Sequence, residues 1–138
     1  MKRKGLLIVI SGPSGAGKGT VYNEVLARRP EIRRSVSVTT RAPRKGEIDG
    51  VHYYFKTVEE YQRMIANGEF LETASVYSNY YGTPKAPVYE MLADGNDVMF
   101  EIDTLGAKQI KQIFPEAVTM FIIPPSFEIL EQRLRARG

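Results

Sequence analysis

Residues 5–18 read Gly5-Leu-Leu-Ile-Val-Ile-Ser-Gly-Pro-Ser-Gly-Ala-Gly-Lys18, and this stretch decides the fold. Its first half, residues 5–11, is an apolar run without alternation, which is typical of a parallel strand covered on both faces. Apolar residues then recur at helical spacing over residues 17–28, and Pro30 closes that segment. The stretch is therefore predicted to form a strand, a glycine-rich loop and a helix.

The glycine-rich loop has the spacing of a phosphate-binding loop, or P-loop. Glycines let the backbone curl so that successive N–H groups converge on phosphate oxygens, and the helix that follows offers its positive end. Lys18 is expected to reach the β and γ phosphates of ATP. The residues predicted to contact ATP are Gly12, Pro13, Ser14, Gly15, Ala16, Gly17, Lys18, Gly19 and Thr20. The alternative is a glycine-rich turn that joins a strand to a helix and binds nothing.

One position departs from the general P-loop pattern. Gly19 stands where the pattern has a serine or threonine whose hydroxyl binds magnesium, and Thr20 comes one residue too late. Mg²⁺ usually keeps several of its waters when it binds to proteins. We therefore expect Mg²⁺ to arrive with ATP and to be held mostly by water and ATP oxygens, and we assign it no protein ligand.

Strands and helices alternate along the rest of the chain. Residues 97–103 and 118–123 are apolar runs that predict two more buried strands. A helix is predicted from Thr104 to about Pro115, and another begins after Ser126, its expected N-cap. This alternation predicts an α/β fold of the P-loop NTPase type, in which helices flank a parallel sheet and ligands bind at the carboxyl ends of its strands.

Residues 35–84 interrupt this alternation. They hold short apolar stretches and many aromatic residues, and a helix is predicted over residues 58–67 with Tyr61, Met64 and Ile65 pointing inward. The segment is therefore expected to form a small mixed α/β insertion.

Two arginines in this insertion are candidates for binding a phosphate. Arg41 and Arg44 lie three residues apart, and Tyr53 follows them. Guanidinium groups pair with phosphate oxygens through charge-assisted hydrogen bonds, so the three side chains could clamp one dianionic phosphate. Arginines near a turn are more often solvated, and the residues alone leave both interpretations open.

Bulk composition excludes several classes of protein. The chain has 138 residues, 43% of them apolar, which is enough for one domain with a hydrophobic core. It has no cysteine, so neither a disulfide framework nor a thiolate metal site is available. The net charge of +3 falls short of a nucleic-acid-binding tail, and the N-terminal apolar run is too short for a signal peptide or a membrane span. We expect a cytoplasmic protein with no nucleic-acid or membrane partner.

Several runs of the sequence resemble the guanylate kinase family, in the order in which that family has them. They are Ser11-Gly-Pro-Ser-Gly-Ala-Gly-Lys18, Thr39-Thr-Arg-Ala-Pro-Arg-Lys-Gly-Glu47, Gly68-Glu-Phe-Leu-Glu72, Asn79-Tyr-Tyr-Gly-Thr83, Glu101-Ile-Asp103 and Pro124-Pro-Ser126. The resemblance covers residues 5–138 and implies transfer of the γ-phosphoryl group of ATP to GMP, and also to dGMP, giving ADP and GDP in purine metabolism.

The resemblance also implies a set of site residues. The GMP phosphate is expected to be held by Arg41, Arg44, Tyr53 and Tyr81. The guanine is expected to face Ser37, Glu72, Thr83 and Asp103. A carboxylate such as Glu72 accepts from both N1–H and the exocyclic amine of guanine, whereas adenine has an unprotonated N1 at that edge.

Each of these roles has a structural alternative. Glu72 could be an exposed charge at a strand end, Tyr81 an ordinary rim aromatic, and Asp103 the cap of the helix that begins at Thr104. Phosphoryl transfer depends on alignment and charge neutralisation, so no general base is required. The residues expected to be catalytic are Lys18, Arg41, Arg44, Arg133 and Arg137. The last two lie four apart on one helical face and resemble lid arginines, although solvated arginines would look the same.

The resemblance further implies a domain plan. The chain is expected to be a single kinase domain with a core at 1–34 and 85–123, a GMP-binding insertion at 35–84 and the start of a lid at 124–138, beyond which the family continues. A homodimer is compatible with this plan. The main alternative is a non-catalytic guanylate-kinase-like module that binds phosphopeptides or nucleotides, and a kinase for another acceptor such as AMP is a third.

Overall fold

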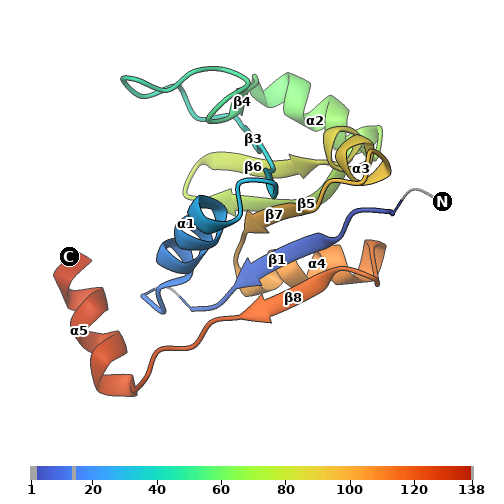
Figure 1. Cartoon of the computed structure of the whole chain (residues 1–138). Helices are drawn as coiled ribbons and strands as arrows, with labels where there is room; N and C mark the ends of the chain where they lie inside the picture. The colour runs from blue at the N-terminus through green and yellow to red at the C-terminus, as the bar shows by residue number, and fades with distance from the viewer. Residues whose placement is uncertain (1–2, 14, 138) are drawn as a thin grey trace.

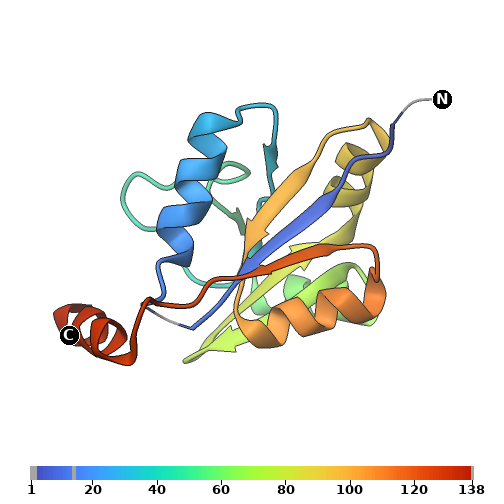
Figure 2. The same cartoon turned by 60° about the horizontal axis from the view of Figure 1, so that its bottom comes forward.

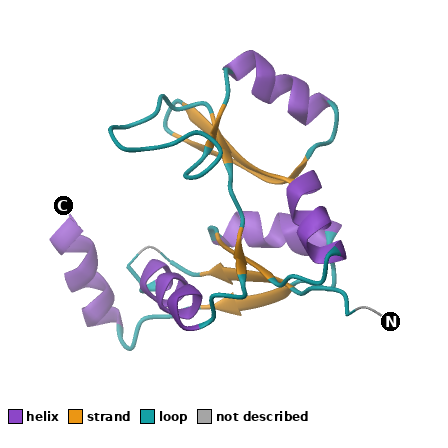
Figure 3. Ribbon diagram, turned by 45° about the horizontal axis from the view of Figure 1, so that its top comes forward, coloured by secondary structure: helices purple, strands orange, loops and turns teal. Residues whose placement is uncertain are grey.

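The computed structural model describes residues 3–13 and 15–137, and of Arg137 only the backbone. These residues form two four-stranded sheets. Figure 3 shows the two sheets as separate layers, with helices beside each of them. None of the helices in the described ranges is long and apolar enough to cross a membrane.

The first sheet is parallel throughout. Its strands lie in the order β2 (Arg33–Arg34), β7 (Val98–Glu101), β1 (Leu7–Ser11) and β8 (Val118–Phe121). Figure 2 shows α1 and α4 on opposite faces of this sheet. The predicted α/β fold with a parallel sheet flanked by helices is therefore confirmed.

The side chains of β1 point alternately to the two helices that cover the sheet. Leu7 and Val9 pack with Ile110 of α4 (Thr104–Ile113), whereas Ile10 packs with Tyr22 of α1 (Lys18–Arg28). Successive side chains of a strand point to opposite faces, so a strand between two helical layers must be apolar at every position.

The second sheet is mixed and is built from residues of the insertion. Its strands lie in the order β4 (Tyr54–Phe55), β3 (Val38–Thr39), β6 (Asn79–Pro84) and β5 (Phe70–Val76). β3 runs parallel to β4 and antiparallel to β6, which in turn forms an antiparallel hairpin with β5.

Helix α2 (Val58–Ala66) covers the face of this sheet that points away from the first sheet (Figures 1 and 3). The Tyr61 ring packs between Phe70 and Tyr80, with ring centroids 5.0 and 5.3 Å apart. Tyr80 is therefore a packing residue. Side chains of a strand alternate, so the neighbouring Tyr81 points toward the first sheet.

The two remaining helices are α3 and α5. The sequence analysis made no prediction for α3 (Lys85–Ala93), which follows Pro84 and contains Pro87 in its first turn. Proline is tolerated there because the first-turn N–H groups of a helix have no intrahelical partner. α5 (Phe127–Arg137) begins after Ser126, whose hydroxyl accepts from the N–H of Ile129 at 3.2 Å, as expected for an N-cap.

Two expectations about burial are wrong. The predicted strand at 118–123 forms as β8, but its residues Val118 to Phe121 are exposed, because among the described residues β8 pairs only with β1. Ile65 was expected to point inward but is 49% exposed, since the Tyr61 side of α2 faces the sheet.

The two sheets meet where β5 runs beside α4. The side-chain amide of Gln109 donates to the carbonyl of Thr73 and accepts from its N–H, both at 3.1 Å. Leu71, on β5, is fully buried and belongs to the hydrophobic core of the first sheet. This junction joins the two sheets into one packed unit.

Gly82 of β6 makes room for the Phe70 ring, which packs against Tyr61 of α2. A Cβ on Gly82 would lie 2.6 Å from Cδ1 of Phe70, a distance at which the ring must move. Gly82→Ala should destabilise the protein by about 1–3 kcal/mol through overpacking, as measured by urea unfolding. Gly19→Ala is the matched control, because its Cβ would meet Glu101 at an ordinary 3.5 Å. Equal stabilities of the two variants would contradict this packing.

Candidate functional site

The P-loop lies at the carboxyl end of β1, and its path requires glycine. The φ angles of Gly15 and Gly17 are 83° and 96°, in the left-handed region that residues with a Cβ rarely adopt. A Cβ on Gly12 would lie 2.3 Å from the carbonyl oxygen of Ile122. The predicted contact residue Ser14 lies outside the described residues.

The loop leaves the start of α1 open to an anion. Gly17 is the N-cap and offers no side-chain acceptor, and no acidic residue lies in the first turn of α1. The first N–H groups of a helix then remain available to a ligand, and the helix dipole favours a negative one. Lys18 folds back so that its Nζ donates to the carbonyl of Gly12 at 3.1 Å, which keeps the ammonium group beside the loop.

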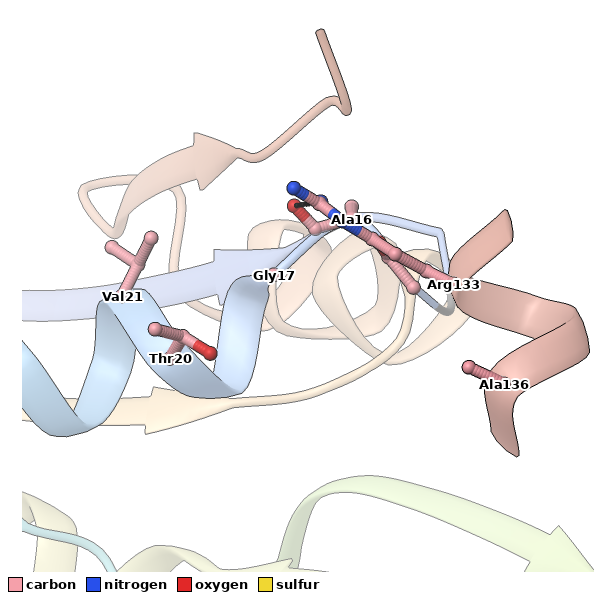
Figure 4. Close-up of a pocket in the computed structure, with 7 residues that line it drawn as sticks. Ala16, Gly17, Thr20, Val21, Arg133 and Ala136 are labelled. Carbon is pink, nitrogen blue, oxygen red and sulfur yellow. Dashed lines mark hydrogen bonds between the residues drawn. The ribbon is translucent and has the colours of Figure 1, made fainter. Parts of the chain in front are cut away.

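Arg133 of α5 reaches over the same loop (Figure 4). Its guanidinium donates to the carbonyls of Gly15 and Ala16 at 3.1 and 3.3 Å. The same residues border a cavity of about 520 Å³, which is lined by Gly15, Ala16, Gly17, Thr20, Val21, Arg133 and Ala136. The structure therefore brings Arg133 together with the predicted P-loop residues. The side chain of Arg137 lies outside the described residues.

An acidic residue to which the sequence analysis assigned no role lies beside this loop. The two carboxylate oxygens of Glu101, at the end of β7, lie 3.5 and 3.6 Å from where a Cβ on Gly19 would stand. Among the described residues, no three histidine, aspartate or glutamate side chains cluster as a metal site would require. An acidic residue at the carboxyl end of a buried strand is the signal that points to Glu101.

The predicted phosphate residues of the insertion are partly assembled. Arg41 lies over the Tyr53 ring, 5.2 Å from its centroid, and Tyr53 packs edge-on against Tyr81 at 6.1 Å. Arg44 lies on the same loop, but its side chain is exposed and makes no hydrogen bond with the described residues. The structure thus brings together Arg41, Tyr53 and Tyr81, and it leaves the Arg44 side chain apart.

Arg41 is held by Glu47, which the sequence analysis assigned no role. The guanidinium donates to both carboxylate oxygens of Glu47, at 2.8 and 3.0 Å. These hydrogen bonds, with one from the backbone N–H of Arg44, lower the pKa of Glu47 to about 2. The bond to Glu47 likewise raises the pKa of Arg41. Both groups are therefore charged at every physiological pH.

Two of the predicted guanine residues, Glu72 and Thr83, are buried and hydrogen-bonded to each other, whereas Asp103 is exposed. Glu72 is 6% exposed, and its Oε1 accepts from the Thr83 hydroxyl at 2.7 Å. Asp103 caps α4 by accepting from the N–H of Gly106 at 2.7 Å, as the structural alternative for this residue predicted. The alternative of an exposed Glu72 is wrong. Ser37 is half-buried just before β3.

The carboxylates of Glu72 and Asp103 lie close to one another. Oε2 of Glu72 and Oδ1 of Asp103 are 3.1 and 3.2 Å from where a Cβ on Gly106 would stand. Burial raises the pKa of Glu72, and the neighbouring Asp103 raises it further, while the Thr83 hydrogen bond lowers it. This pair of acids therefore suits a ligand that presents N–H donors, which would satisfy both carboxylates.

Comparison with known proteins agrees with these features. The family model described as guanylate kinase matches residues 4–138. A guanylate kinase of Carboxydothermus hydrogenoformans is 61% identical over 135 residues, covering 98% of this chain and 66% of the relative. One from Symbiobacterium thermophilum is 57% identical, covering 99% of this chain and 65% of the relative.

A solved structure is also similar. The crystal structure of guanylate kinase from Anaplasma phagocytophilum has a TM-score of 0.75 and 39% sequence identity, covering all of this chain and 70% of that one. The chain thus spans about two thirds of the length of the curated relatives it matches.

Glu72 should lower the stability of the protein without a ligand. A buried carboxyl whose pKa is raised stabilises the fold while it is protonated, and that contribution is lost as the pH rises through its raised pKa. Glu72→Gln removes the charge and keeps an acceptor for Thr83, so it should raise the melting temperature at pH 8 by about 3–5 °C, on the order of 1 kcal/mol. The gain should disappear at pH 4.

The control for this measurement is Glu116→Gln, which changes an exposed glutamate outside the pocket. It should leave the melting temperature unchanged at both pH values. A Glu72→Gln protein that is no more stable than the unsubstituted protein at pH 8 would contradict the assignment of a charged, buried Glu72.

Proposed function

The chain belongs to the guanylate kinase family, and from this premise we propose that it transfers the γ-phosphoryl group of ATP to GMP, giving ADP and GDP. One observation carries the proposal: the buried carboxylate of Glu72 beside Asp103, in a chain whose other sheet ends in a P-loop. Such a pair of acids suits the two N–H donors of guanine and would leave adenine with unpaired partners. The same pocket would accept dGMP.

On the donor side, the N–H groups of the P-loop and Lys18 are proposed to hold the ATP phosphates. The 520 Å³ cavity beside the loop gives the donor room against Thr20 and Val21. Arg133 already lies on the loop, so it can exchange the carbonyls of Gly15 and Ala16 for phosphate oxygens. Arg137 is proposed to join it from the same helix. In this proposal residues 124–138 are the start of a lid over the core, 1–34 and 85–123.

On the acceptor side, residues 35–84 are proposed to hold GMP. Arg41, Arg44, Tyr53 and Tyr81 are the proposed phosphate ligands. Ser37, Glu72, Thr83 and Asp103 are the proposed guanine ligands. Tyr81 and Thr83 alternate along β6 with the residues that pack under α2, so both point to the face toward the first sheet, where GMP would lie opposite the P-loop.

Glu101 is the acidic group proposed to act on the divalent cation that accompanies ATP. Its carboxylate lies beside Gly19, and it could bind a water of the metal rather than the metal itself. Glu101 and the hydroxyl of Thr20 are the proposed groups that would hold hydrated Mg²⁺ with ATP. When bound, the cation would neutralise charge on the β and γ phosphates.

The proposed mechanism consists of alignment and charge neutralisation. The insertion orients the GMP phosphate so that its oxygen faces the γ phosphorus, and Lys18 and the arginines offset the charge that develops on the transferred group. No side chain needs to remove a proton, because the attacking phosphate oxygen is already anionic. A non-catalytic module is the weaker candidate, because it would have no use for Lys18 and the glycines that shape the loop.

The acceptor preference tests the proposed function. Mixed with Mg-ATP, the protein should release ADP when GMP is added, with a kcat/KM about 10³-fold or more above that for AMP. A coupled assay of ADP release checks this, and calorimetry with each monophosphate checks binding separately. Equal rates and equal affinities for GMP and AMP would overturn the guanine assignment.

Lys18→Ala tests whether ATP and GMP bind to different parts of the site. The substitution removes a phosphate-facing charge, so kcat should fall by about 10²–10³-fold or more. The Kd for GMP should stay unchanged, because none of the proposed GMP ligands lies in the P-loop. Lys108→Ala, which removes an exposed lysine of α4, is the control and should keep full activity. An active Lys18→Ala protein would remove Lys18 from the mechanism.

A further inference from the structure

Glu47 contacts both arginines that are proposed to bind the GMP phosphate, Arg41 and Arg44, although no role has yet been assigned to it. Its carboxylate accepts two hydrogen bonds from the Arg41 guanidinium. Oε1 also accepts from the backbone N–H of Arg44 at 2.7 Å, and the backbone N–H of Glu47 donates to the Arg44 carbonyl at 3.0 Å. One side chain therefore links the side chain of the first arginine to the backbone of the second.

This ion pair differs from the other arginine–glutamate pairs of the described residues. The side chains of Arg41 and Glu47 are 12% and 19% exposed, whereas those of Arg28 and Glu24 in α1 are 77% and 59% exposed. An exposed pair contributes little because water competes for both partners. A bidentate pair that is mostly shielded from water fixes the orientation of the guanidinium plane.

The hydrogen bonds leave one edge of Arg41 for a ligand. A guanidinium has five N–H groups. Both on NH1 are used, by the carbonyl of Ala42 at 3.0 Å and by Glu47, and one on NH2 is used by Glu47. The remaining N–H groups, on Nε and NH2, lie on the same edge of the plane and are not used by these acceptors, although the Tyr81 side chain is near enough to help Glu47 raise the pKa of Arg41. This edge can bind two oxygens of one phosphate.

A competing interpretation treats Glu47 as a rival of the phosphate. If both anions needed the same edge of Arg41, Glu47 would have to leave before GMP could bind. The hydrogen bonds do not support this, because Glu47 occupies the edge formed by NH1 and NH2 and not the edge formed by Nε and NH2. Glu47 also closes the turn of residues 44–47, a role that a rival of the ligand would not need.

We propose that Glu47 is a positioning residue for the acceptor phosphate: it orients Arg41 so that its open edge faces the phosphate, and it closes the turn that carries Arg44. The inference rests on the proposed function, since it assumes that these arginines bind the phosphate of GMP. It also accounts for the Arg44 side chain, which is exposed and available while its backbone is tied to Glu47.

Preorganisation of this kind acts on phosphate binding and not on guanine binding. A guanidinium already oriented loses less rotational freedom when the ligand arrives. Because Glu47 has a pKa of about 2, the arrangement should also be insensitive to pH across the physiological range. Removing Glu47 should therefore weaken ligands that carry a phosphate and spare those that do not.

The test compares Glu47→Ala and Glu47→Asp with the unsubstituted protein, using GMP and guanosine as probes in calorimetry. Glu47→Ala should raise the Kd for GMP about 10–100-fold while changing the Kd for guanosine less than about twofold. In the coupled assay, KM for GMP should rise by a similar factor and KM for ATP should not change. Glu47→Asp keeps the charge and should recover part of the loss.

Glu24→Ala is the matched control, because it breaks an arginine–glutamate pair of the exposed kind and should leave GMP binding unchanged. Tighter GMP binding by Glu47→Ala would overturn the proposal in favour of a rival anion. Equal losses for GMP and guanosine would overturn it in favour of a general role in folding. Absence of GMP binding in the unsubstituted protein would instead count against the proposed function.

Discussion

The junction between β5 and α4 is the constraint on which the rest of the structure depends. Gln109 binds the backbone of Thr73 as a neighbouring strand would, and Leu71 is buried in the core of the other sheet. These contacts fix the strand that carries Glu72 beside the helix that Asp103 caps. The acceptor pocket is therefore not a property of the insertion alone, since its acids come from both sheets and are held together by apolar packing and a paired amide hydrogen bond.

That arrangement sets stability against function. A buried carboxylate with a second acid nearby costs free energy, and a neutral side chain in place of Glu72 would fit the fold better. The same acids favour binding when a ligand supplies N–H donors, because the donors hydrogen-bond to carboxylate oxygens that otherwise have too few partners. Sites that bind by hydrogen bonds commonly trade stability for recognition in this way. The P-loop shows a milder form of the same trade, since Gly12, Gly15 and Gly17 give up side-chain contacts so that the backbone can reach a phosphate.

Sequence patterns predicted the parts of the molecule that depend on local order. The unbroken apolar run of β1, the glycines after it and the helical spacing of α1 follow from neighbours in the chain, and all three form as expected. Arg41, Arg44 and Tyr53 were candidates from the residues alone, whereas the other acceptor residues could be named only through a family resemblance. Hydrogen bonds between residues far apart in the sequence could not be predicted. Gln109 and Glu47 look like ordinary polar residues in the sequence, and only the fold places them against Thr73 and Arg41. The exposure of β8 was missed for the same reason, because an apolar run does not reveal how many strands flank it.

The central claim is that the P-loop holds the phosphate donor, whereas the insertion and Asp103 hold the acceptor. Hydrogen–deuterium exchange with each ligand alone tests it most directly. GMP should slow exchange in residues 37–83 and around Asp103 while leaving residues 12–20 unchanged, and ATP should do the reverse by protecting the N–H groups of the P-loop. Protection of the P-loop by GMP, with no change in residues 37–83, would contradict this division between a donor site and an acceptor site.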